Sequence, residues 1–502
     1  MNIDYLAIGS ELVLTLTALL VLVVDLFLRP EAKRLLNPLA GLGTVMAIVV
    51  AAIAYGDDRA VFDGMFVASD FALVFKLLFL GTLLAILVLS YHYFAEGQYF
   101  QGEYYVLLLT SFLGMLFLAS ARDLLLLFLA LETVSVPGFV MAGLRKRDLY
   151  SSEAALKFFL IGVLAVAVML FGLSFVYGEA GTTALEGVAD TLRGDARPDP
   201  ILLGSLLMVI VGFGFKVSAV PFHFWAPDTY SGSPLPVTAM LAVASKAAGF
   251  AGLLAICFIA FEPYASAWAP TMGVLSVVTM TIGNLIALQQ RDIVRLLAYS
   301  SVAQAGYMLL PFGLAQAGGG FVNQLAVQAV VFYLVAYAIM NVGAFAVVIA
   351  VHRRTGRRAI ADYAGLGYSS PLLAIGMTVF LLSLGGAPLT VGLWAKFVVF
   401  QAAAAAGQYV LAAFLVLNTI LAMFYYLAVV RTMWYGEPDR PGPRLRPGLA
   451  LKATVVALTV ATIGLGAYPA YQNLDLGADV AASPPAEDVQ AGPGQLGLGR
   501  ER

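Results

Sequence analysis

Five lysines inside long apolar stretches are the side chains of this sequence best placed to do chemistry. They are Lys76, Lys157, Lys216, Lys246 and Lys396. A lysine at the centre of a lipid bilayer costs about 2.5–3.5 kcal/mol on insertion scales, so something must offset that cost. Ionisable groups at such depth more often mark paths for ions or protons than inert structural ion pairs. The alternative is that these lysines belong to inert structural ion pairs.

Lys246 and Glu132 lie deep in their stretches. Lys246 is 11 residues after Leu235 and 15 before Phe261, which places it about 16 Å from the start of its helix. Glu132 lies nine residues into its own stretch, also near the middle. Burial disfavours the charged form of a lysine, and a nearby carboxylate favours it. A buried lysine with a movable carboxylate partner can therefore take up and release a proton, and Glu132 and Lys216 are candidate partners.

Glycine and proline interrupt two apolar stretches close to the other deep lysines. Lys216 lies within GFGFKVSAVP (212–221), and Lys396 follows GGAP (385–388). Unwound backbone at membrane depth is tolerated only where it is buried in protein or lines a wet cavity. Two such broken helices at corresponding places point to a transport path. His223 follows the first break, where it either relays a proton or is a hydrogen-bonded loop histidine.

Three further ionisable residues lie nearer the predicted membrane surfaces. Lys76 is five residues into its stretch, and we expect it to extend to the surface as an anchor. Lys157 is four residues into its stretch. At this depth its side chain either extends to the membrane surface or takes part in proton transfer. Asp228 is expected to tie down the Pro-rich loop that follows His223.

The composition indicates a membrane protein. Hydrophobic residues make up 61% of the 502 residues and charged residues only 12%, whereas soluble proteins are about 25% charged. A net charge of −2 excludes a nucleic-acid partner held by bulk charge. The single cysteine, Cys257, excludes an internal disulfide, an iron–sulfur cluster and a cysteine-based zinc site. No phosphate-binding glycine loop and no histidine cluster occurs, so we expect no redox centre, metal or ATP site in this chain.

Fourteen stretches are long enough, at about 20 residues, to span a bilayer as helices. They are Leu6–Leu28, Leu39–Tyr55, Phe71–Tyr93, Glu103–Ala121, Asp123–Leu144, Glu153–Tyr177, Pro200–Val220, Leu235–Phe261, Trp268–Leu288, Ile293–Phe312, Gln324–His352, Pro371–Phe400, Tyr409–Arg431 and Leu449–Tyr468. Loops after odd-numbered helices hold 17 basic residues and those after even-numbered helices hold four. By the positive-inside rule, the odd-numbered loops are cytoplasmic and both termini lie outside.

The fifth and tenth stretches share a pattern. The fifth begins RDL (122–124) and continues with ALETVS (130–135), and the tenth begins RDI (291–293) and continues with AYSSVA (298–303). The fifth starts outside and the tenth inside, so the related segments run in opposite directions. Such inverted repeats are found in transporters. Chance similarity between apolar helices is the alternative.

Three segments carry a family resemblance. SSEAALKFFLIG (151–162), the run KVSAVPFHFWAPD (216–228) through SPLPVT (233–238), and ASKAAG (244–249) resemble the antiporter-like subunits of proton-pumping NADH–quinone oxidoreductase, respiratory complex I. Among these subunits the chain is most similar to the N type. The likeness covers all fourteen stretches but not the loop 178–199 or the tail.

The resemblance implies an all-α protein of fourteen transmembrane helices with two inverted five-helix repeats, whose seventh and twelfth helices are broken. The expected parts are three N-terminal helices (1–102), the first repeat (103–261, with outside loop 178–199), the second repeat (262–435) and a loop with the last helix (436–472). The tail (473–502) is expected to be disordered because it is rich in Ala, Gly, Pro and Asp. The proton-transfer residues that it implies are Glu132 tuning Lys216, Lys246 as the central relay, Lys396 in the second repeat, and Lys157. His223 joins this set from the residue analysis alone.

The function implied is proton transfer driven by quinone reduction in other subunits of a bacterial inner-membrane complex. NADH, FMN, iron–sulfur clusters and quinone would bind those subunits, and the partners would include a neighbouring antiporter-like subunit and the lipid bilayer. The alternative is a subunit of a multisubunit cation/proton antiporter driven by a gradient alone. A structural scaffold, in which the deep charges form inert ion pairs, is a third reading. A solute carrier is a fourth, weakened because no pocket-forming set of polar residues stands out.

Overall fold

The computed structural model describes residues 4–54, 56, 59–95, 102–145, 147–194, 199–316, 318, 320–437 and 448–467. Within these residues, 13 helices are long and apolar enough to cross a membrane. This confirms the prediction of a helical protein that crosses the membrane many times. The tail predicted to be disordered, residues 473–502, lies outside the described residues.

Most of the described residues are α-helical. The helices are α1 (Gly9–Phe27), α2 (Leu36–Ile53), α3 (Asp70–Ala95), α4 (Gly102–Ser120), α5 (Leu124–Ala142), α6 (Leu149–Ala180), α7 (Leu185–Gly194), α8 (Pro200–Val217), α9 (Trp225–Gly232), α10 (Leu235–Ala242), α11 (Ala244–Ala255), α12 (Ala265–Ala287), α13 (Ile293–Leu309), α14 (Phe321–Thr355), α15 (Leu366–Ser369), α16 (Pro371–Gly385), α17 (Val391–Ala405), α18 (Tyr409–Tyr435) and α19 (Leu449–Ala467). A short antiparallel hairpin, β1 (Arg59–Val61) with β2 (Phe66–Ala68), lies between α2 and α3.

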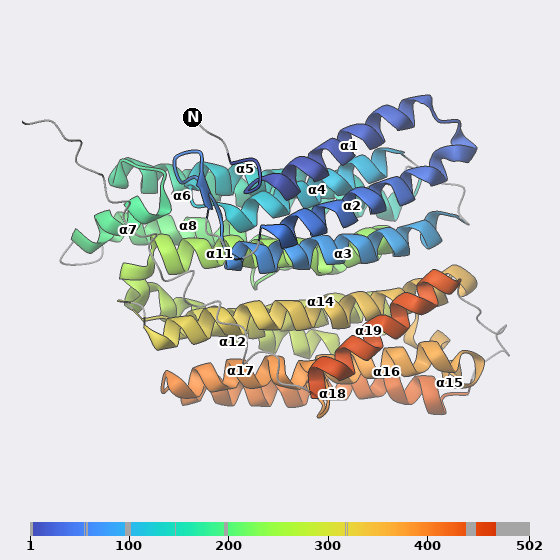
Figure 1. The fold of residues 1–502 in the computed structure, drawn as a ribbon. Helices are drawn as coiled ribbons and strands as arrows, with labels where there is room; N and C mark the ends of the chain where they lie inside the picture. Colours follow the sequence, from blue (N-terminus) through green and yellow to red (C-terminus); the bar gives the residue numbers. More distant parts are fainter. Residues whose placement is uncertain are drawn as a thin grey trace, which may run out of the picture.

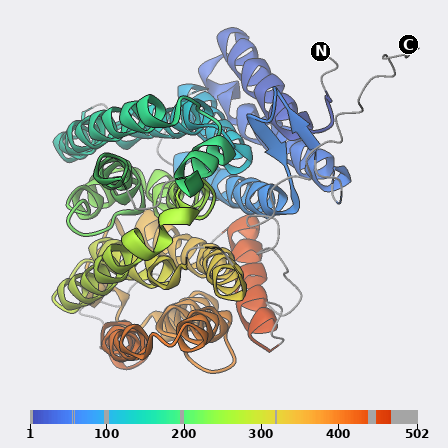
Figure 2. The same ribbon diagram turned by 90° about the vertical axis from the view of Figure 1, so that its left-hand side faces the viewer.

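The long helices run roughly side by side, with α1–α3 along one edge and α16–α18 along the other (Figure 1). Viewed nearly along the helices, the cyan and green segments form one half of the molecule and the yellow and orange segments form the other (Figure 2). Helix α19 returns from the orange half and packs against α14 and α3. The interior between the halves is formed by α10, α11, α13 and α14, whose residues are mostly buried.

Both predicted helix interruptions are present. Helix α8 ends at Val217, where Ser218 adopts a left-handed conformation with φ of 62°. The sequence predicted a single interrupted span over Pro371–Phe400, and the structure has two 15-residue helices, α16 and α17, in its place. They separate at Gly386, whose φ of 90° is readily adopted only by glycine.

A third interruption and a surface helix were not predicted. The stretch Leu235–Phe261 was expected to be one helix, but Val243 departs from helical geometry (φ −112°, ψ −75°) and separates α10 from α11. Neither glycine nor proline lies at this point, so the usual sequence signal of a break is missing. The loop 178–199 contains the amphipathic helix α7, whose apolar residues Leu185, Val188 and Leu192 are buried.

The two halves share a junction that supports the predicted repeat. Gly181 directly follows α6 and Gly356 directly follows α14, and both glycines are left-handed, with φ of 66° and 67°. After each helix, one residue forms an antiparallel bridge with the aspartate that caps an earlier helix: Ala184 with Asp123 before α5, and Ala359 with Asp292 before α13. These aspartates belong to the related RDL and RDI segments. The same backbone arrangement therefore recurs at the two sequence positions that the repeat aligns.

Candidate proton-transfer site

Lys216 is held at the first helix break. It lies in the last turn of α8, where the N–H of Ala219 donates to Gly214 O (2.8 Å) and closes the helix end. The neighbouring carbonyl of Phe215 accepts the Trp225 indole N–H at 3.0 Å. Only 3% of Lys216 is exposed, and its Nζ donates to Ser135 Oγ on α5 at 3.0 Å. The broken backbone is thus satisfied locally while Lys216 points into the protein.

Glu132 lies one helical turn before Ser135 on α5 and is partly buried. Its Oε1 atom accepts no hydrogen bond from the described residues. The positive charge of Lys216 acts on Glu132 electrostatically. Lys216 Nζ is hydrogen-bonded to Ser135, however, and Lys216 and Glu132 form no direct ion pair. A buried carboxylate oxygen without a hydrogen-bond partner is costly, so Glu132 Oε1 is a group that a water molecule or a moved side chain would stabilise.

Lys246 connects the two halves. It lies in the first turn of α11, directly after the unpredicted break at Val243, and is 1% exposed. Its Nζ donates to the backbone O of Ser301 at 2.7 Å and to Ser301 Oγ at 2.5 Å. Ser301 is near the middle of α13, in the second predicted repeat. The central lysine is therefore bonded to the half of the molecule that also holds Lys396.

Lys396 is held at the second break. It is 6% exposed on α17, and its Nζ donates to the O of Gly385, the last residue of α16, at 3.1 Å. A cation at a helix C-terminus is favourable because the carbonyl end of the helix dipole is negative. The same Nζ lies 4.6 Å from the centre of the Tyr307 ring, a distance typical of a cation–π contact. Glu132, Lys216, Lys246 and Lys396 are called the buried row below.

Polar side chains that the sequence analysis missed lie in the second half, next to Ser301 and Lys396. Gln304 donates to the O of Leu384 at 3.0 Å and to Tyr426 Oη at 3.3 Å, and it accepts from Tyr333 Oη at 2.6 Å. Tyr426 Oη also bonds to Ser300 Oγ at 2.5 Å. Tyrosines were counted as apolar when the stretches were identified, so their hydroxyl groups were not recognised as candidate polar partners. The available signal was the glutamine and asparagine in the same apolar stretches.

His223 is 3% exposed beside the first break, with its ring centre 4.4 Å from that of Phe224. Its Nδ1 has no hydrogen-bond partner among the described residues. A backbone hydrogen bond with Pro221 also acts on this histidine, so the proton relay and the hydrogen-bonded loop histidine both stay open.

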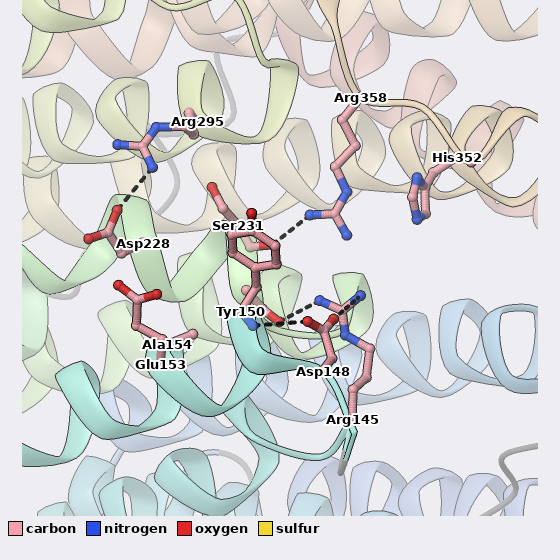
Figure 3. A pocket seen from close by; sticks show the side chains of 12 residues that line it. Arg145, Asp148, Tyr150, Glu153, Ala154, Asp228, Ser231, Arg295, His352 and Arg358 are labelled. Atoms are coloured by element: carbon pink, nitrogen blue, oxygen red, sulfur yellow. Dashed lines mark hydrogen bonds and ion pairs between the residues drawn. The ribbon is translucent and has the colours of Figure 1, made fainter.

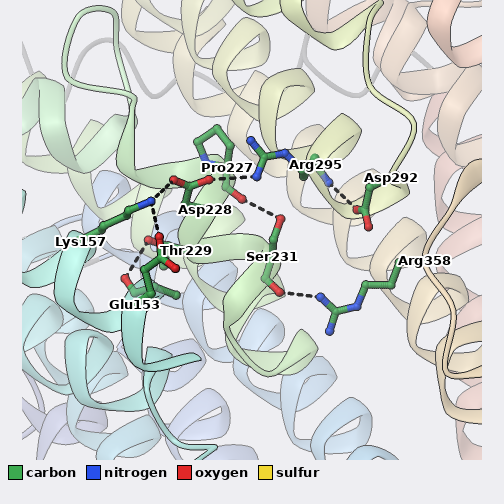
Figure 4. A network of polar contacts seen from close by, with 10 residues as sticks. Glu153, Lys157, Pro227, Asp228, Thr229, Ser231, Asp292, Arg295 and Arg358 are labelled. Atoms are coloured by element: carbon green, nitrogen blue, oxygen red, sulfur yellow. Dashed lines mark hydrogen bonds and ion pairs between the residues drawn. The ribbon is translucent and has the colours of Figure 1, made fainter. Parts of the chain in front are cut away.

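Lys157 lies apart from the buried row, in a partly exposed ion network (Figure 4). Its Nζ is 2.7 Å from both Glu153 Oε1 and Asp228 Oδ2, and Arg295 Nη1 on α13 is 2.9 Å from Asp228 Oδ1. The prediction that Asp228 ties down its loop is confirmed, since Asp228 joins α9 to α6 and α13. Partial burial raises the pKa of Asp228, but the bonds from Lys157 and Arg295 outweigh burial and leave that pKa below its usual value.

The expectation for Lys76 was wrong. Its side chain is 5% exposed and its Nζ is 2.9 Å from Glu11 Oε1 on α1, which is 1% exposed. The ammonium also lies 4.9 Å from the Phe66 ring centre. A buried carboxylate partner on a distant helix removes the need to reach the surface, and spacing within one stretch gives no sign of such a partner.

Residues 121–422 match the family model described as NADH:quinone oxidoreductase/Mrp antiporter, TM. The match covers more than half of the chain and includes the whole buried row. The chain belongs to this family.

Two curated relatives are N subunits. NADH-quinone oxidoreductase subunit N 2 of Streptomyces griseus subsp. griseus is 42% identical over 466 residues, which cover 89% of this chain and 86% of the relative. F(420)H(2) dehydrogenase subunit N of Methanosarcina mazei is 37% identical over 485 residues, which cover 93% of this chain and 96% of the relative.

Solved structures agree with the family. A chain of respiratory complex I from Thermus thermophilus with bound aureothin is 31% identical, with a TM-score of 0.76, and the match covers 92% of this chain and 98% of that one. A chain of the Mrp complex from Dietzia sp. has a TM-score of 0.80 and covers 95% and 97%, at 22% identity. At that identity the likeness shows the fold alone.

The ion network predicts a pH dependence. Because the folded state lowers the pKa of Asp228, the stabilisation is complete above the ordinary aspartate pKa of about 3.9 and is lost as the pH falls through the lowered value. We expect Asp228→Asn to lower the thermal midpoint of the purified complex at about pH 7, with the difference from the wild type shrinking as the pH falls through the lowered pKa of Asp228. Asp190→Asn, which breaks an exposed Asp190–Arg193 pair on α7, is the control and should change little. A difference for Asp228→Asn that persists unchanged at low pH would contradict the charge-based role.

Proposed function

We propose that this chain is the proton-translocating N-type membrane subunit of an oxidoreductase complex related to NADH–quinone oxidoreductase. The proposed task is to move protons along the buried row while quinone is reduced in other subunits. The observation that carries the proposal is the contact of Lys246 with Ser301. It joins a deeply buried lysine of the first half to α13, a helix of the second half.

In the first half, the proposed path runs from Glu132 to Lys216 and on to Lys246. Glu132 Oε1 has no hydrogen-bond partner among the described residues. Lys216 Nζ donates to the hydroxyl of Ser135, which lies on the same helix as Glu132. Gly249 of α11 lies against the Lys216 side chain: a Cβ at this glycine would lie 3.0 Å from Lys216 Cγ. The helix that holds Lys246 therefore approaches the Lys216 chain closely, which suits a handover between the two lysines.

In the second half, hydroxyl and amide groups extend the path toward Lys396. Ser300 and Ser301 lie side by side on α13, and Ser300 is bonded to Tyr426 and through it to Gln304. Gln304 bonds to Leu384 O, next to the Gly385 carbonyl that Lys396 contacts. Serine and tyrosine hydroxyls both donate and accept hydrogen bonds, so they suit proton relay with water in the remaining gaps.

Lys157 and His223 have different places in the proposal. Lys157 is 43% exposed and paired with two carboxylates, so it lies outside the buried row and its role in proton transfer rests on the family resemblance. His223 is buried beside the first break with an unpaired ring nitrogen, which suits a relay between Lys216 and the membrane surface.

The redox chemistry is assigned to partner subunits. Among the described residues, no three of histidine, cysteine, aspartate and glutamate gather where they could hold a metal ion. NADH or another reductant, FMN, iron–sulfur clusters and quinone would bind elsewhere in the complex. Because one relative is named for F(420)H(2) rather than NADH, the electron donor is left open. We place the chain in the bacterial inner membrane, with both termini outside and a neighbouring antiporter-like subunit at its side.

A subunit of a multisubunit cation/proton antiporter is the second candidate, favoured by the fold it shares with the Mrp complex. The higher identity to N subunits argues against it. Gentle purification of the tagged chain separates the two. We expect copurifying flavin and quinone-reductase activity, and their absence from an intact multisubunit preparation would favour the antiporter.

Replacing Lys246 tests whether the row carries protons. We expect Lys246→Ala to lower proton pumping and quinone reduction in membrane vesicles by at least about tenfold. Lys246→Arg is the sharper variant, because arginine keeps the charge and hydrogen bonds but does not release its proton. We expect Lys246→Arg to lower proton pumping as well. Lys452→Ala, at an exposed position on α19, is the control. Normal pumping by Lys246→Arg would show that only a fixed charge is needed.

Removing one hydroxyl tests the second half of the path. Tyr333→Phe deletes the donor to Gln304 with little change in volume, and we expect proton pumping to fall about fivefold, roughly the cost of one hydrogen bond. Tyr104→Phe is the matched control, since the buried Tyr104 bonds to Ser90 outside the proposed path. Equal pumping by the two variants, measured from acidification per quinone reduced, would exclude Tyr333 from the path.

A further inference from the structure

A cavity of about 460 Å³ lies on the side of the molecule that the basic loops mark as cytoplasmic, and the proposed proton path does not use it. Residues from the loop before α6, from α9, from α13 and from the end of α14 line it. It therefore lies between the two halves of the fold. Figure 3 shows that Arg145 and Arg358 extend into one shared space, with His352 beside Arg358.

The two arginines have donors to spare. Arg145 Nη2 donates to Gly232 O at 2.5 Å and Nη1 lies 3.3 Å from Asp148, while Nε has no partner among the described residues. Arg358 Nη1 donates to Ser231 O at 2.6 Å. Each guanidinium carries five N–H donors. The hydrogen bonds to the last carbonyls of α9 thus use only some of the N–H donors of Arg145 and Arg358.

Three arginines and three carboxylates line the cavity, and Arg358 is the arginine among them that lacks an ion pair within the described residues, since Glu153 pairs with Lys157. Asp228 is shared by Lys157 and Arg295, and Asp148 pairs with Arg145. Arg358 is partly buried and forms no ion pair with a described carboxylate. Burial, and after it the nearby charge of Arg145, lower the pKa of Arg358. Two guanidiniums facing one half-buried space repel each other, and an anion between them would remove that cost.

We propose that this cavity binds a phosphate group, held between Arg145 and Arg358. Planar guanidinium groups match the geometry of phosphate oxygens with paired hydrogen bonds. The volume suits a headgroup-sized ligand. The phosphate belongs to an anionic phospholipid headgroup or to a free phosphate. Basic pockets between transmembrane helices on the cytoplasmic side commonly take lipid headgroups, and the side chains of Leu149 and Tyr150 at the start of α6 are 85% and 78% exposed beside the cavity. Bound phosphate would join the end of α14 to α9 and so fasten the two halves together.

The test uses the full chain, purified in neutral detergent within its complex, and follows hydrogen exchange of the segments 148–154 and 352–362. Three additions are compared: inorganic phosphate, dihexanoyl phosphatidylglycerol and dihexanoylglycerol, which lacks phosphate. Each is titrated against the wild type, Arg358→Gln, Arg145→Gln and the control Arg34→Gln, an exposed arginine on the predicted cytoplasmic loop before α2. Copurification of the complex with each variant reports that it folds and assembles.

Protection by phosphatidylglycerol alone would assign the site to a lipid headgroup, and protection by inorganic phosphate as well would assign it to phosphate from either source. In both cases we expect Arg358→Gln and Arg145→Gln to raise the half-saturating concentration on the order of tenfold, the cost of one charge-assisted hydrogen bond, and Arg34→Gln to leave it unchanged. Equal protection by dihexanoylglycerol, no protection by either phosphate compound, or binding unaffected by both arginine variants would overturn the proposal.

Discussion

The central constraint on this structure is that neither a broken helix end nor a lysine charge can stand alone in a hydrocarbon environment. The chain resolves both problems together. Lys396 donates to the last carbonyl of α16, and Lys246 donates to a carbonyl in the middle of α13. The break after Lys216 is closed by its own turn and by Trp225. Lys396 thus stabilises a broken helix end while the helix end stabilises its charge.

The helix ends also give the three lysines of the row different electrostatic surroundings. Lys216 lies at the C-terminal end of α8 and Lys396 against the C-terminal end of α16, where the helix dipole favours a cation. Lys246 lies in the first turn of α11, where the dipole disfavours one. The three lysines of the proposed path therefore differ in how the neighbouring helix dipole acts on their charge.

Residue types and spacing predicted the membrane helices, both Gly/Pro breaks and the burial of Lys216, Lys246 and Lys396, because the cost of placing charge or open backbone in lipid is visible in one sequence. Contacts between distant helices could not be predicted in the same way. The pairing of Lys76 with Glu11, the bond from Lys246 to Ser301 and the Tyr333–Gln304 contact depend on how helices pack. The break at Val243 was missed because packing around Lys246, and not a glycine or proline, accompanies it.

Ordered water between the charged residues of the buried row is the most direct test of this account. A density map of the assembled complex, at a resolution that shows single waters, would reveal whether water joins Lys216 to Lys246 and the Ser300–Gln304 hydroxyl and amide groups to Lys396. The account predicts a continuous chain of waters and side-chain hydroxyls from Glu132 to Lys396. Tightly packed apolar side chains filling the space between these lysines, with no water in any gap, would contradict it.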